Sequence, residues 1–265
     1  MAKLTDEVTK SISEYQAALQ LADAGAEYNP GPWVVAKKIS RILFGIWSQG
    51  VPAVWKIAYE EISGTVFLYG DPRTPHARTA GWFSQVLGPQ IERALGPTAL
   101  DQLDFSTGEI FHIPGWGDKM PDFAVISQSR RGSSLACFML EVGYHNEQSM
   151  EAIIDEVCLW HGYGCPVIVG IKITDNTVDA TAYDPRIEVL AKRKAMPDLR
   201  FHLGQGSLVP CTGPNTHVIE IPTSLLLSRA SRSAIFPSKV NVLCIDLFPL
   251  QSKIRQWVLD CHMQT

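Results

Sequence analysis

The feature that most constrains this chain is an amphipathic stretch followed at once by a short run of purely apolar residues. Residues 147–161 place Ile153, Val157 and other apolar side chains at helical spacing. The glycines of residues 162–164 end that pattern. Residues 166–171 are then continuously apolar, which is typical of a strand covered on both faces. Together they predict an α/β fold built around a buried sheet.

The residues before this pair extend the pattern. A helix is expected over Gly81–Leu95, with Gly88-Pro89 kinking or dividing it. The strands expected after it are Glu109–Ile113, Asp122–Ser127 and Leu135–Val142, with residues 128–133 as a hairpin connection between the last two. The core order is therefore helix, strand, strand, strand, helix, strand in a mixed sheet.

The two ends of the chain give weaker patterns. Helical spacing over Val8–Leu21, Trp33–Gln49 and Val51–Ile62 predicts an N-terminal helical extension. We therefore expect residues 1–70 to pack as helices on an α/β domain of residues 71–265. Short strands are predicted over Val178–Tyr183, His217–Ile221 and Val240–Phe248, a loop over Phe201–Asn215, and a final helix over Ser252–Cys261.

Two acidic residues stand at the ends of predicted neighbouring strands. Asp122 follows Pro121 and opens one strand, and Glu141 closes the next. A hairpin would bring these strand ends together. Paired carboxylates can hold Mg²⁺, which activates water and polarises a phosphate. The order of elements and these acids resemble the PD-(D/E)xK superfamily, which implies a restriction-endonuclease-like core.

The chain differs from this superfamily at one important position, that of the superfamily's lysine. That lysine belongs two residues after Glu141, where this chain has Gly143, and residues 147–161 contain no Lys or Arg. Lys172 and Lys119 are possible substitutes, but neither is assigned that role. Losing the cation removes a main electrostatic contribution to phosphodiester hydrolysis.

Residues 140–144, Leu-Glu-Val-Gly-Tyr, with Trp160 near the end of the next helix, more narrowly resemble fungal proteins with an EVGY version of the motif. That resemblance suggests arginine-containing cyclodipeptide synthases, which join aminoacyl groups delivered on charged tRNA. We expect this tRNA-dependent transferase activity first. A metal-dependent nuclease acting on DNA or RNA and a non-catalytic interaction module on a decayed nuclease core are the alternatives.

Roles for individual residues follow from these resemblances. The catalytic assignments are Asp122, Glu141, Tyr144 and His145, and the substrate-binding assignments are Glu109, Glu156 and Trp160. The basic residues assigned to nucleic-acid binding are Lys37, Lys38, Arg41, Arg73, Arg78, Arg130 and Arg131. No cofactor is expected for the transferase, whereas a nuclease would hold Mg²⁺ on Asp122 and Glu141. The expected partner is charged tRNA, and the product is a small molecule derived from amino acids.

Composition limits the setting in which these activities operate. The formal net charge is −4, so any nucleic-acid-binding face must be a local basic patch. No apolar segment is long enough to span a bilayer, and the N-terminus has no apolar leader, so we expect a cytoplasmic protein without a membrane partner. The six cysteines are scattered and are expected to be reduced and buried.

Overall fold

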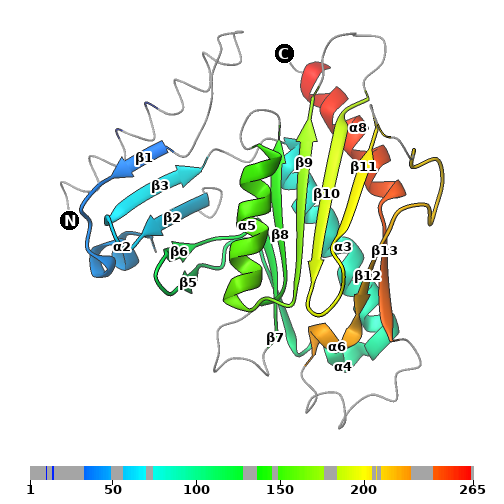
Figure 1. The fold of residues 1–265 in the computed structure, drawn as a ribbon, viewed down its shortest axis with the longest axis horizontal. Coiled ribbons are helices and arrows are strands. Elements are labelled where there is room, and N and C mark those ends of the chain that lie inside the picture. Colours follow the sequence, from blue (N-terminus) through cyan, green and yellow to red (C-terminus); the bar gives the residue numbers. More distant parts are fainter. Residues whose placement is uncertain are drawn as a thin grey trace. The chain divides into compact units, whose positions relative to one another are not determined.

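The structure, a computed structural model, divides the chain into two compact units. Unit 1 contains residues 1–73 and 108–120, and unit 2 contains residues 74–107 and 121–265 (Figure 1). The residues that the structure describes are 10, 14, 33–48, 56–69, 74–127, 136–144, 149–175, 184–204, 207, 210–227 and 241–263. Among these residues, no helix is both long and apolar enough to cross a membrane.

Unit 1 is built on a five-stranded antiparallel sheet with the order β1-β3-β2-β6-β5. Its elements are β1 (Trp33–Ala36), α2 (Arg41–Ser48), β2 (Lys56–Glu60), β3 (Thr65–Tyr69), β5 (Phe111–Ile113) and β6 (Gly117–Lys119). Phe44 of α2 is buried and stacks on Tyr59 of β2, with ring centroids 4.9 Å apart. These rings, Ile57, Val66 and Met120 form the core of the unit.

The predicted N-terminal helices are therefore wrong in two places. Residues 33–36 and 56–60, expected to be helical, are strands, and only residues 41–48 of the second predicted helix are helical. Short apolar runs fit a helix and a strand equally well, and here pairing with β3 decides the outcome. Of the predicted helix over residues 8–21, only Lys10 and Glu14 are described, and both are helical.

Unit 2 is built on a mixed six-stranded sheet with the order β11-β10-β9-β8-β7-β4, in which only β8 and β9 are parallel. The strands are β4 (Leu103–Ser106), β7 (Phe123–Ser127), β8 (Ala136–Tyr144), β9 (Val167–Thr174), β10 (Arg186–Arg193) and β11 (Leu199–Leu203). The predicted strands that became β7, β8 and β9 are confirmed to within a few residues. The mixed α/β class is confirmed with them.

Helix α5 (Met150–Tyr163) connects the parallel pair, as expected of a crossover. Ser149 caps its start by accepting a hydrogen bond from the Ala152 N–H at 3.2 Å. Gly164 ends it with φ 108°, a left-handed conformation that favours glycine. Ile153, Val157 and Trp160 form its buried side.

Helices cover both faces of this sheet. In Figure 1, α5 lies in front of the sheet, and α3 (Thr74–Leu95) and α8 (Phe248–Met263) lie behind it. Phe83 of α3 packs against Phe138 of β8, with ring centroids 6.0 Å apart. The remaining elements are α4 (Pro97–Leu100), β12 (Val218–Pro222), α6 (Thr223–Leu226) and β13 (Val242–Asp246), with β12 and β13 forming a separate antiparallel pair.

Several expectations for unit 2 need correction. Helix α3 starts at residue 74 and runs through Pro89 undivided. The strand predicted over Glu109–Ile113 pairs in the sheet of unit 1, and β4 occupies the corresponding place in unit 2. Part of the predicted loop after Phe201 belongs to β11, and β10 was not predicted. The predicted strand over residues 178–183 lies outside the described residues.

The cysteine expectation holds in part. Cys137, Cys165 and Cys211 are buried free thiols, whereas Cys158 and Cys244 are exposed. Cys158 lies on the exposed side of α5, opposite the buried residues of that helix.

Candidate functional site

Glu141 lies in the middle of the sheet of unit 2, beneath α5. Its side chain is fully buried, and the indole Nε1–H of Trp160 donates a hydrogen bond to Glu141 Oε1 at 2.6 Å. The close packing of α5 on this face depends on Gly170, the partner of Glu141 on β9. A Cβ at Gly170 would lie 2.6 Å from Ile153 Cγ2 and 2.8 Å from Val157 Cγ2. The glycine therefore allows the helix to approach the sheet and places the indole against the carboxylate.

Asp122 precedes β7 and is held by different groups. Its carboxylate Oδ2 accepts the Val142 N–H at 2.6 Å, and its Oδ1 lies 3.0 Å from Nε2 of His76 on α3. Both side chains are largely buried, with 5% of Asp122 and 12% of His76 exposed. His76 was not among the predicted site residues. No local pattern connects it to Asp122.

The two carboxylates of the predicted metal pair are thus engaged by helices on opposite faces of the sheet. Trp160 of α5 binds Glu141, and His76 of α3 binds Asp122. Among the described residues, no group of three or more His, Cys, Asp or Glu side chains is placed to hold a metal ion. Mg²⁺ prefers octahedral oxygen ligands. Here the two carboxylates are bonded instead to an indole, a peptide N–H and an imidazole.

Lys172 lies beside the position where the family's lysine is missing. In the parallel pair of β8 and β9, Lys172 is the register partner of Gly143. Partnered residues project from the same face, so Lys172 shares the face of Glu141, two residues before Gly143. The Lys172 side chain is buried, with 5% of the residue exposed. Lys172 therefore lies on the same face of the sheet as Glu141, on the strand next to Gly143.

The other predicted site residues are dispersed. Tyr144 is buried at the end of β8, Glu156 is half-buried on α5, and Glu109 is exposed in unit 1. The predicted site residues that lie outside the described residues are His145, Arg73, Arg130 and Arg131.

All four described basic residues from that set are exposed. Lys37 and Lys38 are exposed just before α2, and Arg41 begins it. Arg78 of α3 makes an ion pair with Asp260 of α8 at 2.9 Å, so part of its charge is neutralised within the protein.

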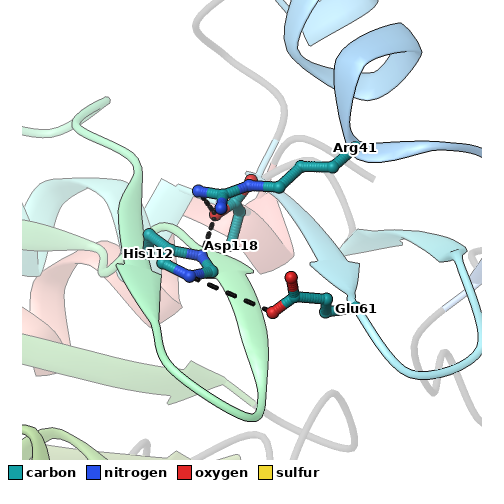
Figure 2. A network of polar contacts seen from close by, with 4 residues as sticks. All are labelled: Arg41, Glu61, His112 and Asp118. Atoms are coloured by element: carbon teal, nitrogen blue, oxygen red, sulfur yellow. Dashed lines mark hydrogen bonds and ion pairs between the residues drawn. The ribbon is translucent and has the colours of Figure 1, made fainter.

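A second polar cluster lies in unit 1, and it was not predicted (Figure 2). His112 Nδ1 lies 2.7 Å from Asp118 Oδ1, and Arg41 Nη2 donates to the same oxygen at 3.3 Å. His112 Nε2 lies 4.0 Å from Glu61 Oε2. These contacts tie the β5–β6 hairpin to the β2–β3 turn and to the start of α2. We assign the cluster a structural role within the unit.

The nearby Tyr59 has an altered acidity. Burial raises the pKa of its phenol, and the neighbouring carboxylates of Glu61 and Asp118 raise it further. The Tyr59 hydroxyl donates a hydrogen bond to the Ile39 carbonyl at 2.9 Å, which also requires the protonated form.

Comparisons with known proteins add no family assignment. No model of a known protein family matches the chain, and no curated protein matches it significantly.

Proposed function

We propose that unit 2 is a restriction-endonuclease-like domain. The proposal is supported by the order α3, β4, β7, β8, α5, β9, with β4, β7 and β8 as an antiparallel meander and β9 parallel to β8. This is the helix, strand, strand, strand, helix, strand order of the resemblance, interrupted by the short helix α4 between α3 and β4 and by the β5–β6 hairpin between β4 and β7.

On this domain we propose a tRNA-dependent transferase that joins aminoacyl groups, arginyl among them, into a cyclodipeptide. The choice of substrate rests on the resemblance to the fungal enzymes. The observation that carries the chemistry is the contact of His76 Nε2 with Asp122 Oδ1 at 3.0 Å. A carboxylate that binds one ring nitrogen orients the imidazole and stabilises the imidazolium that forms when the ring takes up a proton, as in general-base catalysis.

The step that needs this base is the attack of one amino group on the ester of a second aminoacyl-tRNA. The amine nitrogen bonds to the ester carbonyl carbon and loses a proton to the imidazole of His76. The bond from the carbonyl carbon to the 3′ oxygen of the tRNA breaks, and that oxygen receives the proton. A second, intramolecular aminolysis of the same kind closes the ring and releases the other tRNA.

The test is product formation from arginyl-tRNA with a mixture of other aminoacyl-tRNAs, followed by mass spectrometry for diketopiperazines. We expect His76→Ala and Asp122→Asn to lower the rate by about 100-fold or more, the scale of general-base catalysis. His202→Ala is the matched control, because His202 is an exposed histidine of the same unit whose Nδ1 lies 3.5 Å from a carboxylate oxygen of Glu188. No product, or a His76→Ala protein as active as the control, would refute the proposal.

A second candidate function, phosphodiester hydrolysis, is favoured by the pairing of Lys172 with Gly143. A lysine there would supply the cation that the sequence motif lacks. Incubation with Mg²⁺ and plasmid DNA or RNA tests it, with Lys172→Gln and Glu141→Gln as the variants. Cleavage that both variants abolish would support a nuclease and displace the transferase. Cleavage that persists in both would identify a contaminating enzyme.

A further inference from the structure

Helix α2 is apolar on the side that faces away from the core of unit 1. Phe44 is its buried residue. Ile42 and Ile46 lie on the opposite side of the helix, two residues before and after Phe44, and are 77% and 46% exposed. Leu43 is also exposed, at 38%. A helix that is apolar on both sides is normally covered on both sides.

Ile62 and two lysines are exposed close to the start of α2. Ile62 is 86% exposed in the β2–β3 turn, and the turn is held next to the start of α2 by the hydrogen bond from the Ile39 N–H to the Gly64 carbonyl at 2.9 Å. Lys37 and Lys38 are exposed in the segment that connects β1 to α2. We call Ile42, Leu43, Ile46 and Ile62 the α2 outer surface. Its apolar centre and basic edge are complementary to an acidic amphipathic helix.

The chain carries such a segment before β1. Apolar residues recur at helical spacing on one side of residues 4–19: they are Leu4, Val8, Ile12, Tyr15 and Leu19. Asp6, Glu7 and Glu14 supply the acidic charge. Lys10 and Glu14, the two described residues of the segment, are helical and form an ion pair at 3.7 Å with 78% and 54% of their side chains exposed. Both lie opposite the apolar stripe, so solvent exposure of this pair is what docking through the stripe requires.

We propose that the N-terminal stripe of this same chain docks on the α2 outer surface. Residues 22–32 connect the segment to β1 and can extend about 36 Å, which is ample to reach a helix that begins at residue 41. Docking in cis also gives a high effective concentration, so no second molecule is needed. The acidic residues of the segment then lie near Lys37 and Lys38.

The test is hydrogen exchange of the full-length protein measured by mass spectrometry. Ile12→Asp places a charge in the stripe, and Ser13→Asp places the same charge on the polar side one residue later. We expect Ile12→Asp, and not Ser13→Asp, to speed amide exchange of the peptide covering residues 41–48 by about tenfold, the scale of burying one isoleucine. Ile46→Asp should reciprocally speed exchange of the peptide covering residues 8–21.

Three results would overturn the proposal. The first is equal exchange in the two N-terminal variants. The second is protection of residues 41–48 that rises with protein concentration while light scattering reports dimers, because the occupant is then a second copy. The third is sedimentation with anionic phosphatidylserine vesicles that Ile42→Asp abolishes while Ile12→Asp does not, because the occupant is then a lipid surface. Circular dichroism of each variant shows whether unit 1 remains folded.

Discussion

Replacing Trp160 with phenylalanine removes the one indole N–H that donates to the buried Glu141 carboxylate, at 2.6 Å. Losing the partner of a buried acceptor costs about 1–3 kcal/mol, and the smaller ring leaves a cavity that costs roughly a further 1 kcal/mol. We therefore expect the free energy of unfolding to fall by about 3 kcal/mol. Urea unfolding followed by far-ultraviolet circular dichroism measures it, because that signal depends little on the lost tryptophan.

The control is Trp82→Phe, which removes the same atoms from a buried tryptophan that packs edge-on against Phe83. Its expected cost is only the cavity contribution of roughly 1 kcal/mol. A double-mutant cycle with Glu141→Leu isolates the bond, and we expect a coupling of about 1.5 kcal/mol or more. Equal losses in the two tryptophan variants, or a cycle additive within about 0.5 kcal/mol, would refute the assignment of this bond.

Two further predictions concern other contacts. Gly170→Ala should destabilise unit 2 by about 1–3 kcal/mol, because the added Cβ would meet side chains of α5. Gly162→Ala is the control and should be neutral or stabilising by up to about 1 kcal/mol, since a Cβ there meets nothing within 4 Å. The Tm of the two variants, measured by thermal unfolding, tests this difference. The raised pKa of Tyr59 means that, above its ordinary value of 10.0, the unfolded state loses the proton first and stability falls as pH rises. Tyr59→Phe should flatten the decline of Tm between about pH 10 and pH 11, and an unchanged slope would contradict this.

The sequence predicts best where a long periodic segment and its neighbour agree. Residues 147–161 and 166–171 specify a helix and a doubly covered strand by themselves, and the structure has α5 and β9 there. The strands of unit 1 could not be found this way. β2 is only five residues long, and one of its partners, β6, comes from residues 117–119. Its conformation is decided by pairing across the chain.

The same distinction, between features marked locally in the sequence and features set by contacts across the chain, applies to the candidate site. Asp122 and Glu141 were found because proline and strand ends mark them in the sequence. His76 was not connected to Asp122, since the contact joins the first turn of a long helix to a residue before a distant strand. Lys172 was noted, yet its place beside Gly143 depends on the register of a parallel pair, which spacing along the chain does not determine.

The β5–β6 hairpin has a consequence for synthesis on the ribosome. It is encoded between β4 and β7 but completes the sheet of unit 1 by pairing with β2. While the chain emerges, the edge of β2 that later pairs with β6 stays without this partner until α3, α4 and β4 have been translated. An exposed strand edge in a nascent chain invites non-native pairing. Truncated products that end before residue 108 would keep that edge permanently, so they should be more prone to aggregation than the full-length chain.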